Sequence, residues 1–357
     1  KEFNFGVDFS VLQNRINLTA DTYRRLSDGQ IMKATVPLET GEGSITTNIG
    51  AVRNTGIELG LNLGVIRNKN FTWDVNLAFA RNWSKITELP NGDDVSNNWF
   101  IGERLNVLRD YTSAGIITTD GITMRTKDGD RHYTLQEVYD TFGPGGQGLK
   151  WYEGQMAVND WNNDGKINDE DKQIFGCTDP KWTGSLSSTM TYKGFDFSFM
   201  LYTKQGQWSR SYFHEQYMNY GDRGRQKVNF DYYIPAGTPV LDKNTGDVTY
   251  LSEAHIGKYP YPNNTEKTGG GYFSSSSAAV RYHKTSFVKV KNITLGYTFP
   301  KAWLSKIAVK HLRLYVNVIN PFCFTDYEGF DPEWASANLT NGGPASVTYQ
   351  IGANIKF

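Results

Sequence analysis

The final eleven residues of the chain, Val347–Phe357, carry the pattern that most constrains its fold. Apolar and polar side chains alternate through this stretch without a break. A period of two is that of a β-strand with one apolar and one polar face. The length also suits a tilted strand that crosses a bilayer, which needs about 9–11 residues. A soluble sheet can show the same alternation, so the recurrence of the pattern along the chain is what discriminates.

The alternation returns along the whole chain. The candidate strands are Glu2–Val11, Ile16–Arg24, Gly56–Val65, a partner strand from Phe71, a weaker Gly102–Ile116, Trp182–Tyr192, Phe195–Tyr202, Phe287–Phe299, Leu312–Val318 and the final strand. Some are followed by short turns, and others by long polar segments, roughly Leu26–Gly50 and Trp208–Lys284. A turn from Pro300 has room for one helical turn, Lys301–Lys306. We therefore expect about ten antiparallel strands, joined by short turns and long loops.

This arrangement favours an all-β fold, an antiparallel transmembrane β-barrel, over a soluble β-sandwich or propeller. Barrels of the outer-membrane type have apolar outer faces, wet interiors, short periplasmic turns and long extracellular loops. Sandwich and propeller strands alternate too, but sandwich strands are usually shorter. Aromatic residues also lie near strand ends, where the interfacial girdles of a barrel would be. They are Trp73, Phe79, Trp83, Tyr297, Phe299 and Phe357.

Composition narrows the class of protein further. The 37 Lys and Arg residues balance the 37 Asp and Glu residues, so charge gives no case for nucleic-acid binding. No apolar run approaches the roughly 18 residues of a transmembrane helix, whereas barrel strands give only a weak hydropathy signal. Cys177 and Cys323 lie far apart, without metal-ligand spacing. The chain opens directly in a strand, and we expect it to be a piece of something longer.

The sharpest local motif is the Asp-rich loop Asp160–Asp171. It places oxygen ligands at loop positions 1, 3, 5, 7 and 12 with a glycine at 6, the pattern that wraps a hard cation. The candidate ligands are Asp160, Asn162, Asp164, Lys166 through its backbone carbonyl, and Asp171. Position 12 is Asp rather than the longer Glu, and no amphipathic helix precedes the loop. The sequence predicts a structural Ca²⁺ or Mg²⁺ site, and the alternative is an Asx-rich turn with no metal.

Aromatic residues gather in the long segment Trp208–Lys284. The candidates for contact with a substrate or partner are Trp208, Tyr212, Phe213, Tyr217, Tyr220, Tyr232 and Tyr233. They could stack on sugar rings or dock a protein, and the alternative is packing of the loop on itself. The stretch Gly143–Gly148 formally matches a dinucleotide-binding pattern, but Pro144 lies inside it and no strand precedes it. No catalytic motif stands out, so we expect neither an enzyme nor an organic cofactor.

Several stretches together resemble the C-terminal part of the SusC/RagA-like family of TonB-dependent outer-membrane transporters. The matching stretches are Asn54–Leu59, Asp160–Asp171, Phe175-Gly176, Pro180–Gly184, Tyr192–Phe197, Ser286–Pro300, Leu314–Asn320 and Gly329–Glu333. They occur in the family's order and rough spacing, and they span most of the chain. The resemblance implies a 22-stranded barrel in the bacterial outer membrane, of which this chain supplies about ten strands.

The resemblance also implies a function and partners. The family imports oligomeric nutrients, usually glycans and sometimes peptides, together with a SusD-like surface lipoprotein and with energy from TonB–ExbB–ExbD. The TonB box, the plug domain and the first half of the barrel precede the part matched here, so residues 1–357 correspond to the C-terminal barrel. The rival hypothesis is a secreted β-rich protein that binds or cleaves glycans with the same aromatic residues.

Overall fold

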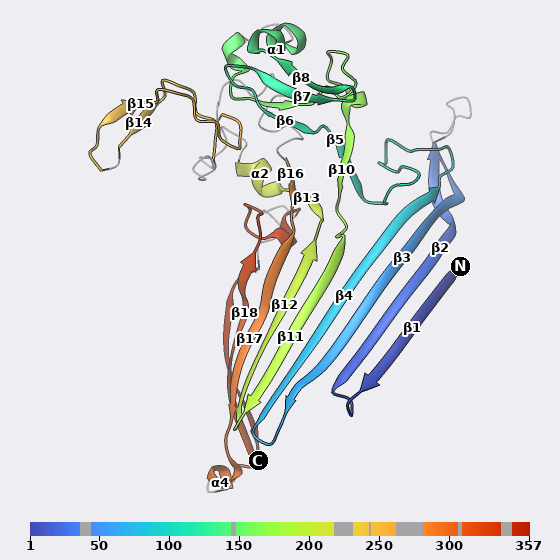
Figure 1. The fold of residues 1–357 in the computed structure, drawn as a ribbon, viewed down its shortest axis with the longest axis vertical. Helices are drawn as coiled ribbons and strands as arrows, with labels where there is room; N and C mark the ends of the chain where they lie inside the picture. Colours follow the sequence, from blue (N-terminus) through green and yellow to red (C-terminus); the bar gives the residue numbers. More distant parts are fainter. Residues whose placement is uncertain are drawn as a thin grey trace.

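A computed structural model of the chain describes residues 1–35, 44–143, 148–217, 231–242, 244–261, 281–305, 309–336 and 345–357. Its main feature is one antiparallel sheet in which nine strands follow one another in chain order (Figure 1). We call this sheet the wall. Its strands are β1 (Glu2–Val11), β2 (Ile16–Thr35), β3 (Ser44–Arg67), β4 (Phe71–Glu88), β11 (Trp182–Tyr192), β12 (Phe195–Gln205), β17 (Phe287–Thr298), β18 (His311–Phe324) and β19 (Thr348–Lys356).

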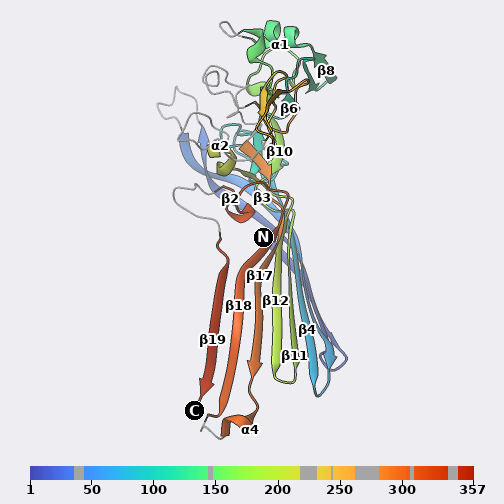
Figure 2. The same ribbon diagram turned by 90° about the vertical axis from the view of Figure 1, so that its left-hand side faces the viewer.

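The wall separates two ends of the molecule, which we call the turn end and the loop end. The connections β1–β2, β3–β4, β11–β12 and β17–β18 lie at the turn end, below in Figures 1 and 2. The helix α4 (Lys301–Leu304) lies there too, so the helical turn expected after Pro300 is present. The segments between β4 and β11, between β12 and β17 and between β18 and β19 form the loop end, which stands above the wall in both views.

Alternation along the strands gives the wall one apolar and one polar face. Leu295, Val316 and Ile351 pair in register across β17, β18 and β19, and their exposed fractions are 52%, 46% and 87%. One residue along each strand, a polar row runs across the other face. There Thr294 donates a hydrogen bond to Asn317 at 3.0 Å, and Asn317 donates one to Gln350 at 3.0 Å. The same three strands therefore present two faces suited to two different solvents.

Tyrosine rings on the polar face cover glycines of the neighbouring strand. Tyr23 pairs with Gly56, and Tyr315 pairs with Gly352. A Cβ added to either glycine would lie 2.3 Å from the tyrosine Cζ, which no real contact tolerates. Each glycine thus makes room for a ring that lies across the ladder and shields its backbone.

Two of the strand assignments made from sequence are wrong. The segment Leu26–Gly50 is not a long loop, because β2 continues to Thr35 and β3 begins at Ser44, with pairing from Ile31↔Asn48 to Thr35↔Ser44. Backbone hydrogen bonds form a ladder whatever the side chains are, so a polar sequence can extend a strand beyond its apolar part. Register shifts around Gln30 mark where the regular apolar pattern is lost.

The second error concerns Gly102–Ile116, which contributes no strand to the wall. It contains β5 (Val107–Asp110) and β6 (Ser113–Ile116), which pair at the loop end with β10 (Gln173–Cys177) and β9 (Met156–Val158). The wall of the described residues consequently has nine strands rather than the ten expected.

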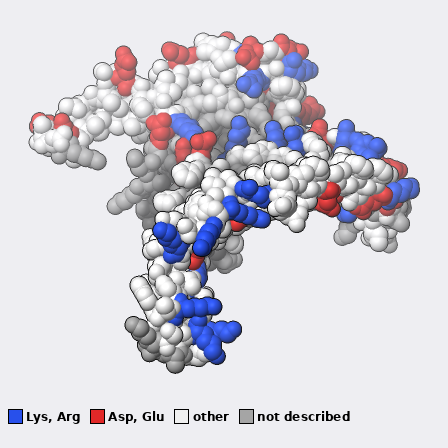
Figure 3. Space-filling view, turned by 60° about the horizontal axis from the view of Figure 1, so that its bottom comes forward, with Lys and Arg blue, Asp and Glu red and all other residues white. Residues whose placement is uncertain are grey.

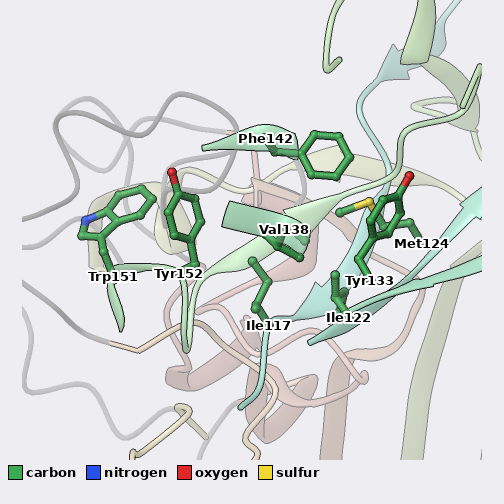
Figure 4. Close-up of a cluster of buried hydrophobic side chains, with 9 residues drawn as sticks. Ile117, Ile122, Met124, Tyr133, Val138, Phe142, Trp151 and Tyr152 are labelled. Carbon is green, nitrogen blue, oxygen red and sulfur yellow. The ribbon is translucent and has the colours of Figure 1, made fainter. Parts of the chain in front are cut away.

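Residues 107–177 form a compact unit at the loop end, which we call the outer unit. Besides β5, β6, β9 and β10 it contains β7 (Ile122–Thr126), β8 (Gly129–Tyr133), α1 (Leu135–Phe142), η2 (Leu149–Trp151) and η3 (Asp169–Asp171). Its core buries Ile117, Ile122, Met124, Tyr133, Val138, Phe142, Trp151, Tyr152 and Ala157 (Figure 4). The core explains why these short elements hold together away from the wall.

The rest of the loop end is built from small elements. They are β13 (Trp208–Arg210) paired with β16 (Tyr282–Lys284), α2 (Tyr212–Tyr217), the hairpin β14 (Pro239–Leu241) with β15 (Val248–Tyr250), and η8 (Pro332–Trp334). Among the described residues, no helix has the length and apolar character needed to cross a membrane.

Candidate functional site

The Asp-rich loop folds around the side chain of Asp160, which is fully buried. Its Oδ1 accepts a hydrogen bond from the backbone amide of Asp164 at 3.2 Å, and its Oδ2 accepts one from Gly165 at 2.9 Å. Gly165 has a φ of +76° and Asn163 one of +62°, so both lie in the left-handed region. These contacts bend positions 1 to 6 of the loop back onto its first residue.

The far end of the loop closes on Asp171, which is also fully buried. Its two carboxylate oxygens accept backbone amide hydrogen bonds from Asn162 at 3.3 Å and Asn168 at 2.8 Å. Burial raises the pKa of the Asp171 carboxyl, and the charge of Asp160 raises it further. No ion pair with a described Lys or Arg neutralises either carboxylate. The loop therefore holds two buried carboxylates whose ionised forms lack a positive partner in the described chain.

The five predicted cation ligands share this one loop. Asn162 Oδ1 accepts the amide of Asp164 at 3.2 Å, and Asp164 Oδ1 accepts the amide of Lys166 at 2.8 Å. In the part of the chain that the structure describes, no three His, Cys, Asp or Glu side chains are grouped closely enough to hold a metal ion. The predicted site also uses the side-chain amide oxygen of Asn162 and the backbone carbonyl of Lys166, which are not among these four residue types. The cation site therefore stays a prediction.

The predicted aromatic contact residues lie within the packing of the loop end. Phe213 and Tyr233 are buried, while Trp208, Tyr212 and Tyr232 are half-buried. For Tyr217 the structure describes only its place in α2, and Tyr220 lies outside the described residues.

Three of the rings that the structure describes show which neighbours they have in the same chain. The ring of Trp208 stacks edge-on against Phe175, with 5.5 Å between centroids, and that of Phe213 does so against Phe330 at 4.7 Å. Tyr233 donates a hydrogen bond to Glu153 at 2.7 Å. Packing within the chain accounts for the buried rings, whereas the half-buried rings remain partly exposed.

A buried polar network joins four segments of the loop end around His214. Ser211 Oγ lies 2.6 Å from His214 Nδ1 and 2.6 Å from the hydroxyl of Tyr327. The Tyr259 hydroxyl lies 3.3 Å from His214 Nε2 and donates a hydrogen bond to the carboxylate of Glu328. Because that hydroxyl proton is committed to the carboxylate, the Nε2 of His214 must carry the donated hydrogen. Burial favours the neutral imidazole, in which Nδ1 then accepts a hydrogen bond from Ser211.

Burial is the main cause that lowers the pKa of His214 to about 3, and the neighbouring His283 and Lys258 lower it further. The rings of His214 and His283 stack with centroids 3.6 Å apart, so a second positive charge there would be repelled. Ser211 is fully buried, which leaves no room for a substrate beside its hydroxyl. The network thus has the contacts of a structural clasp and no access for catalysis.

The hairpin β14–β15 projects from the loop end (Figure 1), and it has an exposed apolar face. Pro239 pairs with Tyr250 and Leu241 pairs with Val248, so these four side chains share one face. All four are exposed, Leu241 by 60% and Tyr250 by 71%. A hairpin of two short strands is marginally stable alone in water, and an apolar face of this kind is typical of a contact surface.

Sequence reasoning missed this hairpin and α1, although both leave signals. Asp242–Asp247, rich in turn formers, separates two short β-branched and aromatic runs, as in a hairpin. Thr134 precedes α1 with Glu137 three residues on, which is a capping box. Both signals lie inside long polar segments, which lack the extended alternation that predicts a strand of the wall.

Comparison with known proteins now adds to this geometry. No protein-family model matches the sequence. The chain is 28% identical over 383 residues to TonB-dependent receptor P39 of Formosa agariphila, covering 99% of this chain and 35% of that protein. It is 29% identical over 358 residues to TonB-dependent receptor SusC of Bacteroides thetaiotaomicron, covering 99% of this chain and 31% of that one. The chain thus spans about a third of the length of these relatives.

Solved structures give the same fold. The structure of the RagAB peptide importer in the "open-open" state aligns with a TM-score of 0.66 at 21% identity, over 100% of this chain and 34% of that chain. The structure of the RagAB peptide transporter aligns with a TM-score of 0.65 at 20% identity, over 100% and 35%. The chain therefore has the fold of part of an outer-membrane β-barrel and is similar in sequence to TonB-dependent receptors. The resemblance to the C-terminal part of SusC/RagA-like transporters is thereby confirmed, and these relatives are receptors rather than enzymes.

Proposed function

We propose that this chain forms the C-terminal barrel wall and outer loops of a TonB-dependent importer of oligomeric nutrients. The observation that carries this proposal is the wall, which presents apolar rows on one face and polar rows on the other. Both end strands of the sheet, β1 and β19, leave one edge without a neighbour in the described chain. Unpaired strand edges are not stable in lipid, so further strands must complete the barrel. In this proposal the rest of the protein supplies those strands, to a total of about 22, and also supplies the plug.

The partner in this proposal is a SusD-like surface lipoprotein that covers the loop end. The apolar face of β14–β15 supports it, because Leu241, Val248 and Tyr250 are exposed where such a lid would rest. TonB–ExbB–ExbD would act through the part of the protein that precedes these residues. Substituting Leu241→Ser together with Tyr250→Ser should reduce co-purification of the lipoprotein without loss of the barrel, and unchanged co-purification would count against this contact.

The proposed substrate is an oligosaccharide, with a peptide as the alternative. Half-buried rings at Trp208, Tyr212 and Tyr232 support a sugar, since partly exposed aromatic rings can stack on the apolar faces of sugars. The RagAB structures, whose titles name peptide transport, show a likeness of fold only. Binding of oligosaccharide and peptide libraries to the purified complex discriminates the two, and Trp208→Ala should weaken binding only of a ligand that stacks there.

A divalent cation in the loop Asp160–Asp171 is part of the proposal. Its support is the pair of buried carboxylates without a positive partner among the described residues, because such charges are costly unless paired. Chelation or Asp164→Ala should lower the thermal stability of the outer unit and leave the strand content unchanged. Identical melting with and without chelator, in wild type and in Asp164→Ala, would remove the cation.

Extraction of the full-length protein from cells tests the function as a whole. A barrel wall requires detergent for recovery, and uptake of the substrate should depend on TonB. The rival candidate, a secreted glycan-binding or glycan-cleaving protein, would be recovered folded without detergent. That outcome would overturn the transporter proposal.

A further inference from the structure

The four connections at the turn end have a one-sided charge. Residues 12–15, 68–70, 193–194 and 299–310 contain Lys or Arg in every case and no Asp or Glu. By contrast, the loop-end segment 89–181 contains 16 Asp and Glu against 9 Lys and Arg. The zero net charge of the chain therefore hides a strong polarity. Figure 3, in which the turn end comes forward, shows the blue basic side chains gathered there.

The basic connections lie beside one another and form a continuous rim. The amide of Lys193 donates a hydrogen bond to the carbonyl of Asn70, which places it next to the turn that holds Lys69. Thr298 donates to the carbonyl of Gly194, and the chain then runs directly into Lys301. Further along, Lys310 donates to the carbonyl of Lys356 at 2.8 Å. Adjacent turns thus bring their lysines to one edge of the wall.

The lysines of this rim are exposed and uncompensated. The five that the structure describes are Lys69, Lys193, Lys301, Lys310 and Lys356. None of them forms an ion pair with a described carboxylate. Two nearby strand carboxylates already have arginine partners, Asp74 with Arg67 at 3.3 Å and Asp196 with Arg313 at 2.5 Å. The five lysines therefore keep positive charges that no ion pair with a described residue neutralises.

Aromatic side chains lie directly beside the rim. Trp303 in α4 is 61% exposed, and its ring lies 6.4 Å from that of Phe299. Phe299 meets Tyr297 at 5.0 Å, and Tyr297 meets Phe195 at 4.6 Å. Exposed tryptophan and tyrosine rings of this kind sit at the headgroup level of a bilayer. The rim is thus placed where lipid headgroups end and water begins.

We infer that the turn end is a binding surface for anionic phospholipid headgroups. Positive side chains near a membrane surface are attracted to anionic lipid, and each lysine adds to that attraction. In this arrangement the wall crosses the hydrocarbon layer, the aromatic cluster lies at the membrane–water interface, and the lysines lie at the level of the lipid phosphates. The inference rests on the transporter proposal, since it needs the wall to cross the membrane.

The test uses the full-length protein in micelles doped with phosphatidylglycerol or phosphatidylcholine. The variant Lys193→Gln/Lys301→Gln/Lys310→Gln is compared with Lys127→Gln/Lys150→Gln/Lys181→Gln, which neutralises three exposed lysines at the loop end. Wild type and the loop-end variant should bind phosphatidylglycerol more tightly than phosphatidylcholine. The turn-end variant should lose roughly tenfold or more of that affinity. High salt should weaken the preference.

Two results would overturn the inference. One is an equal phosphatidylglycerol preference in both triple variants, or none in wild type. The other is binding of inorganic phosphate alone that is lost in the same turn-end variant. That result would make the surface a site for free anions and not for lipid. Recovery of the protein without detergent would instead defeat the transporter proposal. A detergent-dependent protein without lipid preference defeats only the inference, so the two failures are distinguishable.

Discussion

Large apolar side chains are exposed in the wall and buried in the outer unit. In the wall, Leu295, Val316 and Ile351 share one face and are exposed, whereas Met124 and Val138 in the outer unit are fully buried. Apolar rows of that size on a protein in water would be an aggregation hazard. One chain therefore contains a part made for hydrocarbon and a part made for water, and each needs its own rules of stability.

The largest expected effect comes from emptying the outer unit's core. Tyr152→Ala removes a buried ring that lies 4.8 Å from that of Trp151. Truncation of a large buried aromatic side chain costs about 3–5 kcal/mol. Hydrogen exchange should speed up throughout 107–177 while the wall stays protected. Equal loss of protection in the wall would show that the two regions fold as one unit.

A charge on the wall's apolar face should have the next largest effect. Leu59→Arg places a guanidinium on an exposed apolar position of β3, and Asn62→Arg places one on the polar face of the same strand. Arginine facing lipid near the bilayer midplane costs about 2–4 kcal/mol. We expect Leu59→Arg to reduce folded protein in the membrane and Asn62→Arg to be tolerated. Equal tolerance of both would contradict the assignment of the faces.

Sequence alternation predicted the wall well because successive side chains of its strands alternate between an apolar and a polar face. The strands from Trp182–Tyr192 onward have the expected faces, since one side-chain position in two must meet hydrocarbon. The same reasoning failed beyond Leu26, where the sequence is polar and no longer alternates regularly but β2 and β3 continue to pair. Pattern carries no signal where both faces meet the same solvent.

The candidate site was only partly within reach of the sequence, for a related reason. The spacing of Asp160–Asp171 predicted a loop that binds a cation, with a metal-free Asx-rich turn as the alternative. The structure shows the loop closed by its own carboxylates, and the cation stays a prediction. The clasp of Ser211, His214 and Tyr327 spans 116 residues of chain between its hydroxyl partners, so no local pattern could announce it. Long-range side-chain networks follow from tertiary packing and not from spacing.

Acidification should weaken the loop end at this clasp. The pKa of His214 falls from 6.5 in the unfolded chain to about 3 in the folded one, chiefly through burial. Between these values the unfolded state binds more protons, so stability is complete above about pH 6.5 and declines as pH falls toward 3. By pH 4 the loss is roughly 3 kcal/mol. Hydrogen exchange around Ser211–His214 measures it.

A matched variant isolates the histidine from its neighbours. The pKa of Glu328 is lowered by Lys258 and Tyr259, although burial opposes this, so its carboxylate also loses stabilising contacts in acid. His214→Gln keeps a donor and removes the titration of the imidazole. The pH dependence between 6.5 and 4 should shrink in this variant. An unchanged profile would assign the acid sensitivity to the carboxylate.

The smallest expected effect comes from removing the N-cap of α1. It tests whether this helix of the outer unit is stabilised as helices in water-soluble domains are. Thr134 Oγ1 accepts the amide of Glu137 at 3.2 Å, and Glu137 returns a carboxylate to the Thr134 amide at 2.8 Å. Thr134→Ala should cost about 1 kcal/mol. Thr119→Ala, at an exposed threonine of the same unit, should cost almost nothing. Because the cap acts only on the start of α1, exchange should rise in Leu135–Phe142 before the rest of the core. A uniform rise across 107–177 would mean that α1 and its sheet open together, and that the unit is one cooperative domain standing on the wall.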